Sequence, residues 1–438
     1  MEPKRIKSDS KRSILNRQFD IKNISFFFVF AIYPLLVIPN SLGYFYFPRY
    51  IILGFISILC LLAIIKEKIV KPSLLYIPLV LYLLCILISS LKAINVETAL
   101  LGLFGIQGIP LLGKDNTLAL VNTARFTGFS TIVFCVVLYL SASKIGKSDK
   151  LINVLVICAG IVGILAVLQH FGFNIVPHEE FRDKFPPYGT IGQHNFLATY
   201  TVFILPAAIY RFVKSKNKLW LPCIALIYSG LLVSTTRGAW IALAISMVVM
   251  CIYYLRQKDF RKPFIIAIAV MAIVTAILLP TNDGYLLKRL LSIPTNVSSG
   301  LQLEDSAGSG RLAIWKQVVK LIPDNWAFGV GPDNLIYTGV WLGGNAVVDK
   351  AHNIYLETAV TMGIPALVFY LAFLSFFLFR RWKTDKDFMF FSMISTYLIQ
   401  GFFNIDVIMV LPLFWIVLGL YQGNMEEEKL IESSKAYV

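Results

Sequence analysis

The chain is poor in charged residues and rich in apolar ones. Only 15% of its 438 residues are Asp, Glu, Lys or Arg, whereas 57% are hydrophobic, and the mean hydropathy is +0.72. Soluble globular domains carry about 25% charged residues, so this composition excludes a soluble globular domain. The sequence predicts an all-α polytopic membrane protein.

Several functional signatures are also missing. The chain has no GxxxxGK[ST] loop, which a transporter that hydrolyses ATP would need to hold phosphate. Its six cysteines all fall inside predicted spans, and none stands near a histidine at metal-ligand spacing. We therefore expect buried thiols rather than disulfides, and a protein that needs neither a metal nor a cofactor.

Apolar stretches of bilayer width fill most of the chain. We count about twelve, which predicts about twelve transmembrane helices. The basic, polar residues 1–23 precede a run that is too long for a signal-peptide core, so we expect an uncleaved first span. The predicted spans are 24–40, 50–65, 74–91, 126–142, 151–170, 195–213, 219–234, 238–255, 263–280, 353–379, 387–403 and 405–421.

The excess of basic residues gathers on one side of these spans. Seven segments on that side hold 27 of the 40 Lys and Arg and 12 of the 25 Asp and Glu, which leaves 13 of each for the other side. The positive-inside rule makes the basic side cytoplasmic, and this placement argues against a nucleic-acid partner. Both termini are then cytoplasmic. The segments are 1–23, 66–72, 143–150, 211–218, 256–262, 380–387 and 422–438.

This topology divides the chain into five parts, and the longest polar one faces the periplasm. A basic tail and a last tail flank two groups of spans, which are separated by a large outer loop that we expect to be partly helical. Because the outer loops are long and the cytoplasmic ones are short, function is sought outside. The parts are 1–23, 24–280, 281–352, 353–421 and 422–438.

Two short outer segments carry candidate substrate-binding residues. His194 and Asn195 follow Gly192 at the outer mouth of a predicted helix, although a loop and an ordinary helix cap would look the same. Thr236 and Arg237 lie in a tight turn between two spans, where an arginine is costly unless it meets an anion or water. The alternative is that Arg237 extends to the lipid headgroups.

The large loop contains a candidate anion site. A helix is predicted over 311–322, with Leu312, Trp315, Val318, Val319 and Ile322 on one face and Pro323 as its stop. Arg311 stands at its start, where free backbone N–H groups and the helix dipole favour phosphate. An amphipathic packing helix is the alternative interpretation.

His352 ends the same loop. Asn353, Tyr355 and Glu357 follow it at the start of the next predicted span. A neutral imidazole at the mouth of an anion-binding cavity is suited to be the general base for a hydroxyl group. A lone histidine is often structural, but two arginines predicted on the same side favour a catalytic role.

These residues suit a transfer reaction whose leaving group is a diphosphate. Guanidinium groups hold such a group by paired hydrogen bonds without a metal, and no DxD cluster is visible outside. Because ATP and sugar nucleotides are absent outside the membrane, we expect the donor to be carried on a lipid diphosphate.

Four motifs resemble the O-antigen ligase and polymerase superfamily, and the resemblance is best over about 187–380. They are GQHNFLA from Gly192, STTRGA from Ser234, GVGPDN from Gly329 and HNIYLE from His352, the last followed by Met362-Gly363-Ile364-Pro365. The resemblance implies a membrane glycosyltransferase of the C type (GT-C-like). Its ligase members move a glycan from undecaprenyl diphosphate to a sugar hydroxyl of lipid A-core, without a metal.

By this resemblance Arg237 and Arg311 hold the diphosphate and His352 activates the acceptor, so that the anomeric centre inverts. His194, Asn195, Thr236, Asn353 and Tyr355 are the expected substrate-binding residues. Related enzymes polymerise lipid-linked repeat units or glycosylate protein serine and threonine, and one sequence does not separate them. A transporter of lipid-linked glycan is the alternative of another class; it predicts charged residues in the middle of spans, where this chain has almost none.

Overall fold

The computed structural model of the chain is a bundle of helices with two very short strand pairs. It describes residues 21–39, 44–67, 73–102, 111–112, 118–119, 125–146, 148–176, 186–301, 307–342 and 346–436. The strand pairs are β1 (Leu111–Leu112) with β2 (Leu118–Ala119) and β3 (Trp341–Leu342) with β4 (Ala346–Val347), both antiparallel. The predicted all-helical membrane protein is therefore confirmed in outline.

Five described helices are long and apolar enough to cross a membrane. They are α3 (Phe47–Glu67), α7 (Asp149–His170), α8 (His194–Ser215), α10 (Arg237–Arg256) and α11 (Lys258–Leu278). Each of the twelve predicted spans contains at least one helix, but several of these are shorter, so twelve crossings stay a prediction. The others are α2 (Ile21–Ala31) with η1 (Tyr33–Leu35), α4 (Tyr76–Leu91), α6 (Phe129–Ala142), α9 (Trp220–Val233), α15 (Ile354–Met362) with α16 (Ile364–Leu378), α17 (Asp385–Gly401) and α18 (Leu411–Ala436).

The core of the bundle forms around α8 and the first half of α18. Almost every residue of α8 from Phe196 to Val213 is buried, as is every residue of α18 from Leu411 to Tyr421. Helices α7 and α9 approach closely, because a Cβ at Gly163 would lie 2.2 Å from the carbonyl oxygen of Leu226. The central helices are thus enclosed by protein and the outer ones present apolar side chains to their surroundings.

The predicted span over 353–379 is wrong as a single helix. It breaks at Gly363, whose φ of 93° no ordinary helix contains, and Pro365 stands in the first turn of α16. A side chain at Gly363 would meet the carbonyl oxygen of Ala327 at 2.5 Å, so the break allows a second segment to pass close by. Hydropathy alone did not reveal this break, because the segments on both sides of it are apolar.

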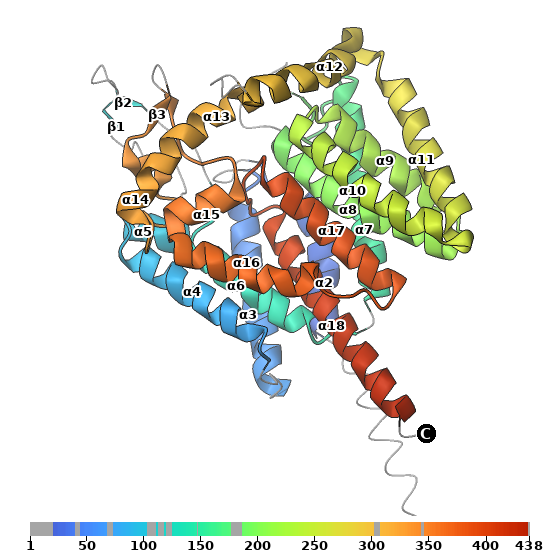
Figure 1. Cartoon of the computed structure of the whole chain (residues 1–438), viewed down its shortest axis with the longest axis horizontal. Helices are drawn as coiled ribbons and strands as arrows, with labels where there is room; N and C mark the ends of the chain where they lie inside the picture. The colour runs from blue at the N-terminus through green and yellow to red at the C-terminus, as the bar shows by residue number, and fades with distance from the viewer. Residues whose placement is uncertain are drawn as a thin grey trace, which may run out of the picture.

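The large loop contains more helix than the sequence predicts. It includes α12 (Thr281–Leu301), which turns sharply at the left-handed residues Asn282, Asp283 and Gly284, and α13 (Ala307–Val318). Figure 1 shows α12 and α13 crossing over one end of the bundle between α11 and α14, while the C-terminal helix projects from the other end.

The predicted helix over 311–322 is only partly right. Pro323 does not end a helix, because it occupies the first turn of α14 (Ile322–Asn325), after the 3-10 turn η2 (Val319–Leu321). Val319 is 50% exposed and so does not belong to the buried face, whereas Val318 is fully buried.

Ion pairs join segments at the end of the bundle opposite α12 and α13. Arg211 and Lys386 both contact Asp149, at 2.7 and 3.0 Å, and Lys214 contacts Asp385 at 2.7 Å. These residues come from three of the segments predicted to share the cytoplasmic side. Their proximity supports the alternation of loops from which that side was assigned.

Candidate active site

The beginning of α8 meets the turn between α9 and α10. The hydroxyl of Thr236 donates to Oδ1 of Asn195 at 3.3 Å, and the amide of Asn404 donates to the Asn195 carbonyl oxygen at 3.1 Å. Thr236 also lies within 3.5 Å of the carbonyl oxygen of His194. Three of the predicted substrate-binding residues are thus brought together by contacts between helices far apart in sequence.

Arg237 is the first residue of α10 and points towards α12. The backbone of Thr235 is left-handed, with φ of 54°, which reverses the chain between the two helices. The residue after Arg237 must be glycine, because a Cβ at Gly238 would lie 2.6 Å from Cβ of Phe403. Nη1 of Arg237 donates to the hydroxyl of Ser292 in α12 at 3.0 Å.

A second arginine enters from α12. Nε of Arg289 donates to the carbonyl oxygen of Thr235 at 3.3 Å, so its side chain reaches the same turn that carries Arg237. Sequence analysis missed Arg289 because it treated this stretch as loop. Leu286, Leu290 and Ile293 recur at helical spacing around it, and that signal could have identified the helix.

Arg311 completes a group of three guanidinium groups. It follows Gly310, whose φ is 82°, and it lies inside α13, which begins at Ala307, four residues earlier than the sequence predicts. Burial, together with the positive charges of Arg237 and Arg289, lowers the pKa of Arg311 to about 10. Like charges held this close favour an anion between them. We refer to Arg237, Arg289 and Arg311 as the arginine cluster.

His352 lies on the chain that leads into α15, within reach of the positive charge of Arg311. Its backbone is left-handed, with φ of 52°, and the indole of Trp315 in α13 donates to the preceding carbonyl, that of Ala351, at 2.9 Å. The arginine-bearing helix and the histidine segment are therefore joined directly. Within the described residues, Nδ1 of His352 is buried without a hydrogen-bond partner.

The surroundings keep His352 neutral. Burial lowers its pKa to about 4, against the opposing charge of Asp349, and the positive charges of Arg311, Arg125 and Lys350 lower it further. A neutral imidazole is the form that can accept a proton at neutral pH. A bound anion would neutralise part of this positive field and strengthen the base.

Asn353 and Tyr355 lie next to His352, but their polar atoms already have partners within the protein. Oδ1 of Asn353 accepts hydrogen bonds from the backbone N–H groups of Tyr355 and Leu356, at 2.9 and 3.0 Å, and so caps α15. The Tyr355 hydroxyl donates to the carbonyl oxygen of Leu398 at 2.7 Å. These contacts fix the segment that presents His352.

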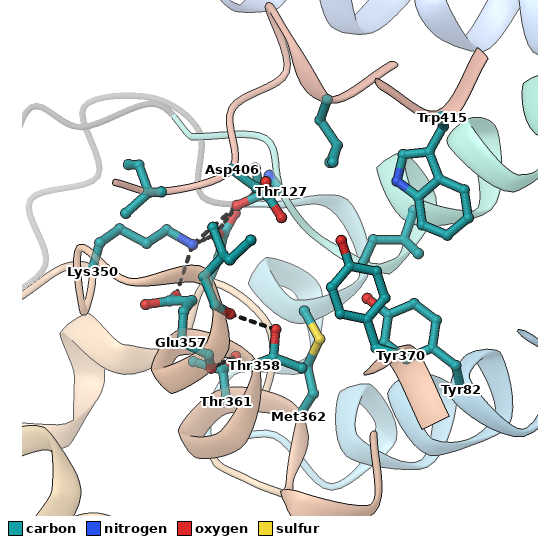
Figure 2. A pocket seen from close by; sticks show the side chains of 15 residues that line it. Tyr82, Thr127, Lys350, Glu357, Thr358, Thr361, Met362, Tyr370, Asp406 and Trp415 are labelled. Carbon is teal, nitrogen blue, oxygen red and sulfur yellow. Dashed lines mark hydrogen bonds and ion pairs between the residues drawn. The ribbon is translucent and has the colours of Figure 1, made fainter. Parts of the chain in front are cut away.

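A separate buried cluster surrounds Lys350. Its ammonium group contacts Asp333, as well as Oε1 of Glu357 and the hydroxyl of Thr127, both at 3.0 Å (Figure 2). Burial lowers the pKa of Lys350, but the charges of Asp333 and Glu357 outweigh that effect and raise it. The cluster borders an enclosed cavity of about 40 Å³, large enough for a few water molecules. Sequence analysis did not predict that Lys350 and Asp333 form an ion pair.

The described residues contain no group of three or more His, Cys, Asp and Glu side chains that could hold a metal ion. The arginine cluster suits a phosphate-bearing group, and the neutral imidazole of His352 suits a hydroxyl proton.

Residues 222–371 match the model of a protein family described as O-antigen ligase. The matched range contains the arginine cluster and His352, as well as the break at Gly363, whereas His194 and Asn195 lie before it. No curated protein matches the chain.

Proposed function

Because residues 222–371 match the O-antigen ligase model, we propose that the chain belongs to the O-antigen ligase and polymerase superfamily and is a ligase-type glycosyltransferase. It moves a glycan from undecaprenyl diphosphate to a sugar hydroxyl of lipid A-core. The reaction takes place on the periplasmic side of the bacterial inner membrane, and it needs no metal.

The observation that carries this proposal is the meeting of the arginine cluster with His352. Arg237, Arg289 and Arg311 come from three different helices, and the pKa of Arg311 is lowered in part by the other two. Holding like charges together costs free energy that a diphosphate would recover on binding. The imidazole of His352 is neutral and buried, its pKa is lowered in part by Arg311, and its Nδ1 has no hydrogen-bond partner among the described residues.

The proposed reaction is a direct displacement at the anomeric carbon. A ring nitrogen of His352 takes the proton of the acceptor hydroxyl while its oxygen forms the new glycosidic bond. The bond from the anomeric carbon to the diphosphate oxygen breaks, and its electron pair stays on the diphosphate. The arginine cluster stabilises that developing charge, and attack from the opposite face inverts the anomeric centre.

His194, Asn195 and Thr236 would bind the donor beside the arginine cluster. The hydrogen bonds among them link α8 to the turn that carries Arg237. Asn353 and Tyr355 would act through the shape of the segment around His352, because their polar atoms hold backbone groups of the protein.

A transfer assay tests the proposal. Purified protein in lipid nanodiscs receives undecaprenyl diphosphate carrying a labelled glycan, together with lipid A-core. We expect label on lipid A-core, and a loss of about 10²–10⁴-fold in turnover for His352→Ala, since a general base contributes that much. The matched control is His170→Ala, because His170 contacts Thr281 at 2.7 Å and lies outside the proposed site.

Other destinations of the label contradict the ligase assignment. Longer chains on the undecaprenyl carrier would indicate a polymerase, and label on an added acceptor protein would indicate an O-oligosaccharyltransferase. Label that stays on the original carrier in every condition would contradict transfer and favour a transporter. Full activity of His352→Ala would remove His352 from the mechanism.

A further inference from the structure

An open apolar groove lies beside the candidate active site. Its volume is about 590 Å³, and it is lined mainly by residues in or next to α16 and α17, with Tyr355 of α15 and Ile245 of α10. This volume lies within the roughly 300–1,000 Å³ of ordinary ligand pockets. Figure 1 shows α15, α16 and α17 together on the face of the bundle towards the viewer, with α13 above α15.

The groove is lined along one face of each of two helices. On both α16 and α17 the lining positions recur at intervals of three and four residues, as one helix face requires. They are Leu371, Leu374, Ser375 and Leu378 from α16 with Phe379 directly after it, and Ser395, Leu398 and Ile399 from α17 with Phe402 and Phe403 directly after it.

The lining offers hydrocarbon and almost no hydrogen bonding. It contains no charged residue, and its three hydroxyl groups each donate to a carbonyl oxygen of the protein. Ser375 donates to Ala372, Ser395 to Ser392 and Tyr355 to Leu398, at 2.7, 3.2 and 2.7 Å. Because these groups already have acceptors, the groove suits a hydrocarbon chain rather than a sugar or a peptide.

Three contacts connect the rim of the groove to the proposed catalytic residues. Phe403 packs against Gly238, the neighbour of Arg237. Phe402 packs edge to face on Trp315, with ring centroids 5.4 Å apart, one turn beyond Arg311. Tyr355 follows His352 by three residues and its ring borders the groove. A molecule whose diphosphate lies among the arginines can therefore place its lipid chain in this groove.

We propose that this groove, which we call the α15–α17 groove, binds the polyprenyl chain of the lipid diphosphate donor. The inference rests on the proposed function and adds the site at which the enzyme recognises the lipid chain of the donor. Its occupant is a branched hydrocarbon that carries a diphosphate at one end, because the arginine cluster complements that charge at the rim. An acyl chain of a bulk phospholipid lacks the diphosphate and so gains nothing from the arginines.

Photo-crosslinking tests the groove independently of turnover. A polyprenyl diphosphate with a photoreactive group in its chain, and a phospholipid with the same group, are each irradiated with the full-length protein in nanodiscs. We expect the diphosphate probe to label peptides of α16 and α17, and inorganic diphosphate to compete. Equal labelling by the phospholipid probe, or labelling of other helices only, would overturn the proposal.

Filling the groove tests its role in transfer. Ile399→Trp and Leu371→Trp should each lower the preference for a long-chain over a two-isoprene donor by about tenfold or more, because displacing even two methylene groups loses that much affinity. Val248→Trp is the matched control: Val248 is 60% exposed on α10 but does not line the groove, and this variant should keep the wild-type preference.

These readouts separate the two proposals. An unchanged chain-length preference in both groove variants would overturn the groove while leaving the transferase intact. A wild-type protein that transfers glycan from no donor would contradict the proposed function, and the crosslinking result would still decide whether the groove binds a polyprenyl diphosphate.

Discussion

Lys350 and Arg311 are buried or half-buried cations near the same histidine, yet their surroundings move their pKa values in opposite directions. Two carboxylates outweigh the burial of Lys350 and raise its pKa, whereas burial and two further arginines lower that of Arg311 to about 10. Asp333 and Glu357 compensate the charge of Lys350. The charge of Arg311 adds to a positive field that a bound anion would compensate, so we assign a structural role to Lys350 and a functional role to Arg311.

Removing the compensated cation should produce the largest change in stability. Lys350→Met leaves Asp333 and Glu357 buried without their counter-charge, which costs about 3–5 kcal/mol of unfolding free energy. The measurement is thermal unfolding in detergent, with Lys218→Met at an exposed site as the control. If Lys350→Met melts with the wild type, the cluster is not structural and the contrast with Arg311 fails.

Changing Arg311 should affect transfer and spare the fold. Arg311→Lys keeps the charge but loses the planar fork, so we expect turnover to fall by about 10²–10³-fold, as when one donor to a developing anion is lost. The same variant should unfold close to the wild-type temperature, because it keeps the positive charge. A lowered melting temperature with near-normal turnover in Arg311→Lys would reverse the assignment.

The smallest expected effect is a shift in pH dependence. The folded protein holds the pKa of His352 near 4, below its ordinary value of 6.5, so its neutral form lasts down to low pH and the associated stability is lost as pH falls from 6.5 towards 4. Asp349 opposes this shift, whereas Arg311, Arg125 and Lys350 promote it.

A bound diphosphate offsets the arginine charges and should raise this pKa by roughly one unit, which corresponds to about 1.4 kcal/mol. The acid limb of kcat should then lie at higher pH than that of kcat/KM for the donor. NMR titration of labelled histidine with and without diphosphate checks the shift, with His352→Gln to assign the signal. Identical titration curves would show that the anion does not bind near His352.

Much of the candidate site could be predicted because its residues sit where the sequence leaves apolar runs. Arg237 and His352 stand at the ends of such runs, and Arg311 follows a glycine-rich stretch at the start of a periodic pattern. We inferred from topology that these residues lie close together, and in the structure the charge of Arg237 lowers the pKa of Arg311, and the charge of Arg311 lowers that of His352.

Tertiary contacts explain what sequence reasoning missed. The partner of Lys350 nearest in sequence is seven residues away and Thr127 is over two hundred away, so no local pattern reveals the cluster. Arg289 was missed because the polar stretch 281–352 was read as an outer loop, whereas α12 runs from Thr281 to Leu301 and continues through Pro294. The apolar run through Gly363 hid a break that a glycine followed by a proline two residues later could have suggested.

The hydrogen bond from Trp315 to Ala351 fixes the distance between the two parts of the site, α13 with Arg311 and the segment with His352. Thirty-six residues separate these partners along the chain, yet one indole N–H joins α13 directly to the segment before His352. The distance between His352 and Arg311 therefore does not depend on the backbone that joins them. We therefore expect that residues inserted at the exposed turn at Gly339 leave the distance between the reacting groups unchanged.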